Sequence, residues 1–363
     1  MPEIPLHASQ TSRALIVAPA WIGDAVMAQV LFQRLHAATP GLVLDALAPR
    51  WVAPVLQRMP EIADVVDSPF GHGELALGAR LRLARTLRAR GYDRVYVLPN
   101  SLKSALVPWL AGIPERIGFV GEARYGLLNR RHVLDKTALP QMVERFAQLA
   151  EAPGAPLPRP LPLPRLASTA AQQTATNAAL GITPPTRVAI FCPGAEYGPA
   201  KRWPARHFAA LAEDLATRGY TIWLLGSGKD RAIADEIVGL AAPGMPIVNF
   251  CGTTALDQAI DLIAQAEFVV CNDSGLMHVA AALDRPLIAV YGSSSPGFTP
   301  PLSPLARIVS LELSCSPCFK RTCPLGHLDC LNGISPQRVL EDCLGTRPNA
   351  SPAACSLPPE TPR

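Results

Sequence analysis

The sequence predicts an α/β fold with two Rossmann-like lobes, each built on a parallel sheet. Short β-rich apolar runs alternate with helical patterns of roughly 10–15 residues, which is typical of βαβ units. This alternation runs twice along the chain, and a proline-rich stretch at residues 152–169 separates the two series. The length of 363 residues also suits two domains, each able to bury a core, better than it suits one.

The first series predicts a lobe at residues 13–151, preceded by a flexible N-terminus at residues 1–12. Its elements are expected in the order strand 14–19, loop 20–24, helix 25–38, strand 42–48, and further helices and strands as far as 93–100. The stretch at residues 152–169 then holds six prolines. Because proline fixes φ and lacks an amide donor, neither a helix interior nor a central strand is expected there, and this stretch is interpreted as the linker between the lobes.

The second series predicts a lobe at residues 170–333. Its strands are expected at 187–194, 220–227, 246–250, 267–272 and 285–292, and its helices near 204–218 and at 255–266 and 275–283. Ser335 and Pro336 suit the N-cap and the first position of a closing helix at residues 334–345. Residues 346–363 are proline-rich and have no apolar period, so they are expected to form a disordered tail.

Composition and charge argue against several classes of protein. The N-terminus lacks a basic region followed by an apolar one, and no apolar run reaches the roughly 18 residues that span a bilayer. Nine cysteines in a long chain of this kind argue for a reducing compartment, so a cytoplasmic location is expected. A formal net charge of +4 is too mild to indicate nucleic-acid binding.

The most informative stretch is NDSGLMH at residues 272–278, between an apolar strand and an alanine-rich helix. In open parallel sheets, ligands lie outside the carboxyl ends of the strands, where such loops lead into helices. Ser274 and Gly275 can present free backbone amides at the helix start, which together with the helix dipole suit a phosphate. Asp273 repels phosphate, so it is expected to orient the loop or to bind a hydroxyl group. The alternative is a plain N-cap with a structural His278.

Two further loops follow strands in the same way. In AWIGDA, Gly23 allows a close approach, and Asp24 can act as a general base toward an acceptor hydroxyl or simply cap the helix. A base that faces solvent needs no large pKa shift for this role, so none is expected for Asp24. In CPGAEYGPAKRWP, Lys201 can neutralise a diphosphate leaving group, with a solvent-facing cation as the alternative.

A third loop, LLGSGKD at residues 224–230, places Asp230 where it can accept a hydrogen bond from a ribose hydroxyl. The loops match neither the G-x-G-x-x-G nor the G-x-x-x-x-G-K-[ST] signature, which argues against a dehydrogenase or a P-loop enzyme. Two lobes with phosphate-suited loops, mostly in the second lobe, match a nucleotide-sugar transferase of the GT-B fold, whose lobes face a central cleft.

Four stretches of the sequence resemble glycosyltransferase family 9. They are residues 18–29, 96–129, 192–204 and 272–303, and the likeness extends from about Arg13 to Leu344. The resemblance implies transfer of L-glycero-D-manno-heptose from ADP-heptose to the first heptose of the lipopolysaccharide inner core on lipid A. It also implies inversion at the anomeric carbon, with no metal or other cofactor required.

The resemblance further implies roles for single residues. Asp24 matches the aspartate proposed as the base, and Lys201 is similar to the lysine that binds the diphosphate. The loop that holds the nucleotide phosphates in the family corresponds to Asp273, Ser274, Gly275 and Leu276, with His278 beside it.

Contacts to the acceptor are expected on the first lobe. Gly23 lies next to the base, and Lys103 and Arg124 are interpreted as partners for acceptor phosphates. Residues 80–94 hold six arginines, which can dock on anionic lipid at the inner membrane surface, each gaining about 1 kcal/mol. A solvated helix face is the alternative for these arginines.

A cysteine-rich stretch does not follow from the transferase interpretation. Its cysteines are Cys315, Cys318, Cys323 and Cys330, with His327 among them. The opening C-x-x-C is half of a zinc-site pattern, but the spacing is irregular and no second C-x-x-C follows in the stretch. Reduced cysteines or an occasional disulfide are therefore favoured over structural zinc.

Three alternatives to the leading function stay open. The first is another heptosyltransferase of the same family with a different acceptor. The second is a two-lobed nucleotide-sugar epimerase, which would convert the donor without an acceptor. The third is a non-catalytic nucleotide-sugar binder, which would hold the donor without turnover.

Overall fold

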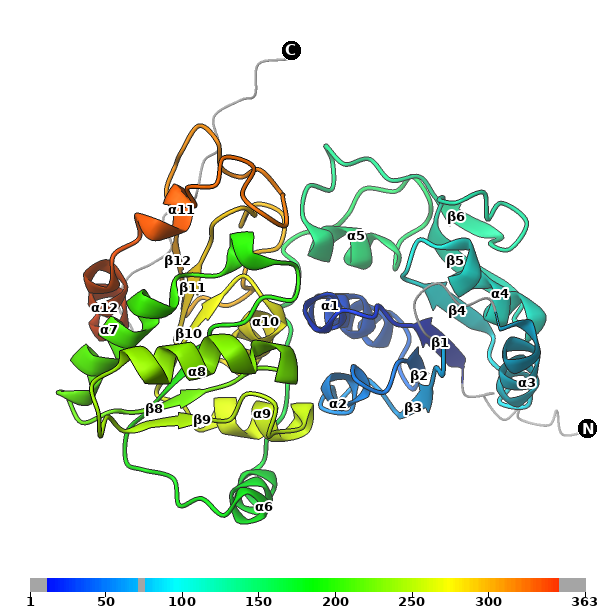
Figure 1. Ribbon diagram of the computed structural model, residues 1–363. Coiled ribbons are helices and arrows are strands. Elements are labelled where there is room, and N and C mark those ends of the chain that lie inside the picture. Colours follow the sequence, from blue (N-terminus) through cyan, green and yellow to red (C-terminus); the bar gives the residue numbers. More distant parts are fainter. Residues whose placement is uncertain (1–11, 71–75, 346–363) are drawn as a thin grey trace, which may run out of the picture.

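Two parallel six-stranded sheets with helices packed around them form the two lobes of the protein (Figure 1). The computed structural model describes residues 12–70 and 76–345. The predicted flexible N-terminus, apart from residue 12, and the predicted tail at 346–363 lie outside the described residues. The predicted α/β class with two Rossmann-like lobes is confirmed.

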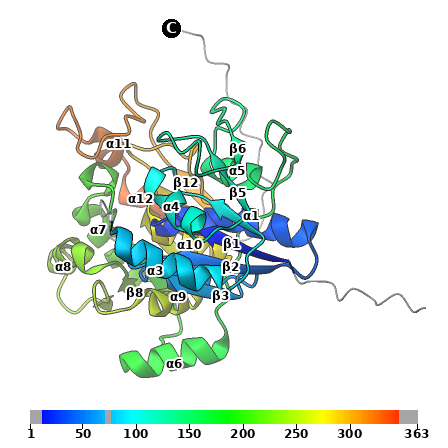
Figure 2. The ribbon, with the colours of Figure 1, turned by 90° about the vertical axis from the view of Figure 1, so that its right-hand side faces the viewer.

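The first sheet has the strand order β3-β2-β1-β4-β5-β6 and pairs its strands in parallel. Its strands are β1 (Arg13–Val17), β2 (Val43–Ala48), β3 (Asp64–Asp67), β4 (Arg94–Val97), β5 (Glu115–Phe119) and β6 (Arg130–His132). Its helices are α1 (Ile22–Ala38), α2 (Ala53–Leu56), α3 (Leu77–Arg88), α4 (Leu102–Leu110) and α5 (Met142–Gln148). The paired helices α3 and α4 lie on the side away from the second lobe, toward the viewer in Figure 2.

The second sheet has the order β12-β11-β10-β7-β8-β9, again with parallel pairs. Its strands are β7 (Val188–Cys192), β8 (Thr221–Leu224), β9 (Ile247–Asn249), β10 (Phe268–Asn272), β11 (Leu287–Val290) and β12 (Ala306–Val309). Its helices are α6 (Ala170–Leu180), η1 (Pro199–Lys201), α7 (Ala205–Ala216), η2 (Gly228–Asp230), α8 (Arg231–Leu240), α9 (Leu256–Ala264), α10 (Gly275–Ala282), α11 (Asp329–Asn332) and α12 (Pro336–Leu344).

The closing helix α12 starts as the sequence predicts. Ser335 is its N-cap, and the Ser335 hydroxyl accepts a hydrogen bond of 3.2 Å from the amide of Arg338. Pro336 occupies the first helical position, where its missing amide costs nothing. The helix packs on α7, so it belongs to the second lobe.

Helix α1 begins earlier than predicted. Its first residue is Ile22 rather than Ala25, because the carbonyl of Trp21 accepts a hydrogen bond of 2.9 Å from the amide of Ala25. Trp21 is therefore the N-cap, and Gly23 and Asp24 lie within the first helical turn instead of the loop.

Three clusters of buried apolar side chains make up the core. One cluster lies on the outer side of the first sheet. A second cluster lies on the outer side of the second sheet. The third fills the space between the sheets and joins the lobes, with side chains from α1 such as Phe32 and from α10 such as Val279. Because α1 and α10 pack against each other there, the first turns of the two helices come together.

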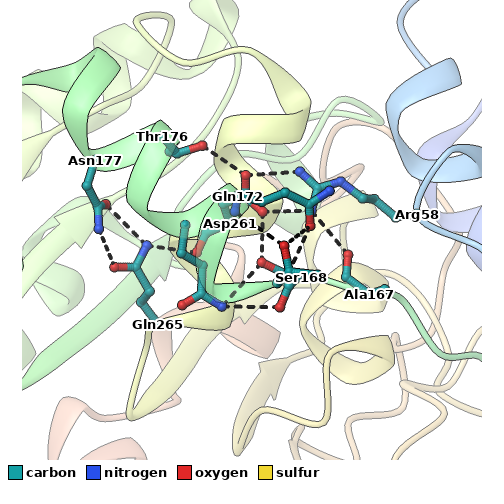
Figure 3. A network of polar contacts seen from close by, with 10 residues as sticks. Arg58, Ala167, Ser168, Gln172, Thr176, Asn177, Asp261 and Gln265 are labelled. Atoms are coloured by element: carbon teal, nitrogen blue, oxygen red, sulfur yellow. Dashed lines mark hydrogen bonds and ion pairs between the residues drawn. The ribbon is translucent and has the colours of Figure 1, made fainter.

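The stretch predicted as the linker ends in a buried polar network that belongs to both lobes (Figure 3). Arg58, just after α2, donates hydrogen bonds of 2.7 and 2.9 Å to the two carboxylate oxygens of Asp261 in α9. Ser168 and Thr176 donate to the same carboxylate at 2.7 and 2.8 Å. The Arg58 and Asp261 side chains are only 9% and 3% exposed, so this ion pair joins the lobes and is largely shielded from water.

Candidate active site at the junction of the lobes

The first turns of α1 and α10 touch each other across the junction. A Cβ atom at Gly23 would lie 2.7 Å from Cδ2 of His278, and one at Gly275 would lie 2.9 Å from Cβ of Ile22. Both distances are shorter than van der Waals contact, so glycine is what permits this approach at each position. Two motifs that are far apart in the sequence therefore form one site.

Asp24 lies in the first turn of α1, partly buried at this contact. Burial raises the pKa of its carboxyl group from 3.8 to about 6, and the positive charge of Lys201 opposes the rise. The expectation of a solvent-facing base with an unshifted pKa is wrong, because the second lobe covers the start of α1. A carboxylate with this pKa is a stronger proton acceptor than an ordinary aspartate and is still ionised at neutral pH.

Lys201 ends the short helix η1, and its Nζ lies 2.5 Å from Oδ2 of Asp273. The two side chains are 17% and 5% exposed, so the ion pair is largely buried and is not the solvent-facing alternative. Nζ also lies 5.0 Å from the ring centroid of Tyr197. Asp273 thus holds the ammonium group of Lys201 in place near the start of α10.

The start of α10 is suited to an anion. Ser274 is the N-cap, but its side chain makes no capping hydrogen bond. The amides of a first helical turn have no partner within the helix, and the helix dipole favours negative charge there. The Leu276 side chain packs against the core, so its backbone is the part that can face a ligand. Together with Lys201, these groups can bind a diphosphate.

His278 is 4% exposed and packs against Gly23. Burial lowers the pKa of its imidazole to about 4, an effect that Asp273 opposes and Lys201 reinforces. The ring is therefore neutral at physiological pH. It can donate one hydrogen bond and shape the contact between the lobes, but it does not supply positive charge to a phosphate.

Asp230 closes the turn η2. Its Oδ2 accepts hydrogen bonds of 2.9 and 2.8 Å from the amide and the hydroxyl of Ser227. A Cβ atom at Gly194 would lie 2.2 Å from Cγ of Asp230, so the carboxyl group lies directly against the backbone of Gly194. Asp230 thus has a structural role in its own turn.

Asn272 is a residue that the sequence interpretation missed, although it stands in the NDSGLMH stretch. It is fully buried, its Nδ2 donates to the carbonyl of Pro193 at 2.7 Å, and its Oδ1 accepts from the amide of Trp203 at 2.9 Å. It therefore ties the loop after β7 and the start of α7 to the end of β10. This cross-loop bonding holds Lys201 and Asp273 within reach of each other.

Arg124 does not have the role expected for it. It is 1% exposed, and its Nη2 donates to the carbonyl of Phe119 at 2.7 Å and to Oδ1 of Asn100 at 3.0 Å. Its Nη1 donates to the carbonyl of Pro99 at 2.6 Å. The guanidinium group thus holds the loop after β4 to the end of β5, and it is buried too deeply to meet an acceptor phosphate. Lys103, in the first turn of α4, is partly exposed.

The cysteine-rich stretch folds against η1 and the segment that follows β11. Four of its cysteines and His327 line one small cavity together with Ala200 and Ser293; the cysteines are Cys315, Cys318, Cys323 and Cys330. All four are free thiols. Within residues 12–70 and 76–345, no group of three or more His, Cys, Asp or Glu side chains is placed to hold a metal ion.

Comparisons with known proteins identify the family that this chain resembles. The sequence model of "Glycosyltransferase family 9 (heptosyltransferase)" matches residues 80–329. Lipopolysaccharide heptosyltransferase 2 of Escherichia coli is 48% identical over 91% of this chain and 97% of its own. Lipooligosaccharide heptosyltransferase 2 of Haemophilus influenzae is 46% identical over 82% of this chain and 88% of its own. The solved structure of the E. coli ADP-heptose heptosyltransferase II superposes with a TM-score of 0.84 at 44% identity, covering 92% of this chain and 98% of that one.

Proposed function

This chain belongs to glycosyltransferase family 9, the heptosyltransferases, and we propose that it transfers L-glycero-D-manno-heptose from ADP-heptose to the first heptose of the lipopolysaccharide inner core on lipid A. Heptose transfer in the biosynthesis of this inner core is the activity of the enzyme. The choice of acceptor rests on the identity of 48% to a relative named heptosyltransferase 2, at nearly full length.

The observation that carries the mechanism is that Asp24 of the first lobe meets the Lys201–Asp273 pair and the start of α10 from the second lobe. In the reaction, the acceptor oxygen bonds to the anomeric carbon while the bond from that carbon to the diphosphate oxygen breaks. Asp24 takes the hydroxyl proton, and Lys201 with the α10 amides offsets the charge that grows on the departing ADP. A single displacement of this kind inverts the anomeric carbon.

We also propose that the site works without a metal ion or other cofactor. Lys201 and the positive end of α10 supply the positive charge that a divalent cation supplies in other enzymes that release a diphosphate. Donor contacts by Asp230, Ser274, Gly275 and Leu276, and an acceptor contact by Lys103, remain part of this proposal. Transfer is expected to continue in the presence of EDTA, and loss of activity that added Mg²⁺ restores would refute the metal-free proposal.

Because the acceptor is an anionic lipid, we propose that α3 contacts the cytoplasmic face of the inner membrane. Arg82 and Arg85 of this helix are exposed. The neighbouring apolar side chain of Leu81 is 43% exposed. Within residues 12–70 and 76–345, no helix is long and apolar enough to cross a membrane. Co-sedimentation with vesicles containing anionic lipid, but not with purely zwitterionic vesicles, is the expected result; equal binding to both would contradict it.

The function is tested by ADP release from ADP-heptose with lipid A inner core that carries one heptose or none. Release with the one-heptose acceptor alone is expected. Release with the heptose-free core would assign the chain to the first heptose instead. Donor conversion without any acceptor would indicate an epimerase, and donor binding without turnover would indicate a non-catalytic binder.

The reaction is expected to slow in acid. Asp24 must be ionised to accept a proton, and its pKa lies at about 6 in the free protein. The kcat/KM for the acceptor should therefore fall by about tenfold per pH unit below that value, as protonation removes the base. Initial rates between pH 5 and 8, at saturating ADP-heptose, measure this. A rate that stays level from pH 7 down to pH 5 would contradict the assignment, because a base with a pKa of about 6 must lose activity over that range.

Removing the charge of Lys201 is expected to weaken both donor binding and turnover. A Lys201→Met variant leaves the leaving diphosphate without its cation, and the loss of one such electrostatic contact costs about 10²–10³-fold in kcat. The same change removes the charge that lowers the pKa of Asp24, so the acidic limb should move to higher pH. Lys136→Met, at an exposed lysine of the first lobe, is the control and should leave the rate unchanged.

Because Lys201→Met also leaves Asp273 buried without its partner, a Lys201→Met/Asp273→Asn variant separates folding from chemistry. The double variant should recover stability but not activity. Recovery of both would show that Lys201 acts only by neutralising Asp273.

A further inference from the structure

Two tryptophans are exposed at the edge of the sheet that carries Asp24. Trp21 is 47% exposed and Trp51 is 51% exposed. They follow the neighbouring parallel strands β1 and β2, so both lie at the carboxyl end of the first sheet, where ligands of such folds bind. Large apolar side chains exposed together beside a site mark a surface that a ligand covers.

Both tryptophans lie at the start of α1, the helix that carries Asp24. Nε1 of Trp51 donates a hydrogen bond of 2.9 Å to the carbonyl of Ala20, which holds its ring against the loop that leads to α1. Trp21 is the N-cap of α1 and Asp24 is the third residue of its first turn, so both belong to the same helix start. The tryptophans thus border Asp24 on the first lobe, whereas Lys201 approaches it from the second lobe.

The chemistry of this surface suits a sugar. An indole has an apolar, electron-rich face, and the single polar group of Trp51 is already bonded to Ala20, which leaves the ring face for other contacts. A pyranose ring offers C–H groups on its faces and hydroxyls around its rim. Stacking on an indole therefore holds the ring without using the hydroxyl that must point at the base.

We propose that Trp21 and Trp51 form a stacking platform for the acceptor sugar and so position its attacking hydroxyl at Asp24. This inference rests on the proposed function, since it assigns a binding surface to the acceptor of that reaction. The donor is bound by the other lobe, so the platform affects acceptor binding and leaves donor binding alone.

The test uses Trp21→Leu, Trp51→Leu and Trp51→Phe variants of the full chain, with an inner-core oligosaccharide that carries one heptose and no acyl chains. Each leucine variant is expected to raise the KM for this oligosaccharide about tenfold, whereas the KM for ADP-heptose changes by less than about twofold. Trp51→Phe keeps an aromatic face but loses the hydrogen bond to Ala20, so it should retain most of the affinity. Trp109→Leu is the matched control, because Trp109 is 48% exposed but lies on α4.

Several results would overturn the proposal. One is an unchanged KM for the oligosaccharide in both leucine variants. Another is an effect seen only with the acylated acceptor, which would make the tryptophans a membrane contact. If Trp109→Leu has the same effect as the other two, the change is not specific to the site.

A binding measurement separates this proposal from the proposed function. Tryptophan fluorescence of the unmodified protein should change on titration with the oligosaccharide in the absence of ADP-heptose, and the change should shrink in both leucine variants. Absence of transfer by the unmodified protein would refute the function, while the fluorescence change would still decide whether the platform binds the sugar.

Discussion

Replacing Asp24 by asparagine is expected to slow heptose transfer severely while leaving ADP-heptose binding intact. A positioned general base contributes roughly 10²–10⁴-fold to a rate, so the turnover of Asp24→Asn should fall by about 10³-fold. Donor affinity should persist because Lys201 and the start of α10, which face the diphosphate in the proposed mechanism, are unchanged. Steady-state kinetics and donor binding by calorimetry measure the two quantities.

The same substitution is expected to stabilise the protein. The folded-state pKa of Asp24, about 6, lies above its ordinary value of 3.8 because burial disfavours the charged form. The folded state therefore binds more protons between these two pH values, and stability falls as the pH rises through them. Above pH 6 the ionised carboxylate destabilises the fold by on the order of 1–3 kcal/mol, a term that neutral asparagine removes.

A helix cap would behave in the opposite way. Asp257 lies in the first turn of α9 and is exposed, so Asp257→Asn is the matched control and should leave activity unchanged while lowering stability slightly. If Asp24→Asn lowers the free energy of unfolding at pH 8, or retains activity near the unmodified level, Asp24 serves the start of α1 and not the reaction.

The double α/β fold is predictable because each sheet repeats one local pattern. Strands such as β7 (Val188–Cys192) and β10 (Phe268–Asn272) are buried throughout and stand out as apolar runs. The edge strand β12 (Ala306–Val309) is only partly buried, and its Arg307 reaches Asp342 at 3.2 Å, so it carries no such run. The four-residue helix α11 (Asp329–Asn332) is too short to show a period.

The site is only partly predictable for a related reason. Asp24, Lys201 and Asp273 each follow the carboxyl end of a strand, which local sequence reveals. Their environment does not show locally, because the contact of Gly23 with His278 joins two lobes and decides the burial that raises the pKa of Asp24. The prediction of a solvent-facing base is wrong for this reason. The local sequence around Asp24 does not show which residues of the other lobe cover the start of α1.

The ion pair between Arg58 and Asp261 is another feature that no local sequence pattern predicts. The two residues are 203 positions apart, and neither stands in a recognisable motif. Burial acts to raise the pKa of the Asp261 carboxyl group, but hydrogen bonds from Arg58, Ser168 and Thr176 outweigh it, and the pKa is lowered overall. The pair therefore contributes stability that is present above the ordinary pKa and is lost as the pH falls through the folded-state value.

Replacing Arg58 by alanine is expected to lower the free energy of unfolding at pH 7 by about 3–5 kcal/mol, because it leaves the Asp261 charge buried without its partner. Chemical denaturation measures the change. Arg50→Ala is the matched control from the same lobe, since Arg50 is 87% exposed and its ion pair with Asp67 contributes about 0–1 kcal/mol. The deficit of Arg58→Ala should shrink in acid, where Asp261 becomes protonated.

An Arg58→Met/Asp261→Leu variant separates the charge from the packing. Removing both partners leaves no uncompensated charge, so most of the lost stability should return. The double variant still lacks the bonds from Ser168 and Thr176 that fix the linker to α9, so its lobes are less firmly placed relative to each other. Because Asp24 and Lys201 come from different lobes, transfer by this variant should be slower even though it is stable. Full activity at restored stability would show that the pair serves folding alone.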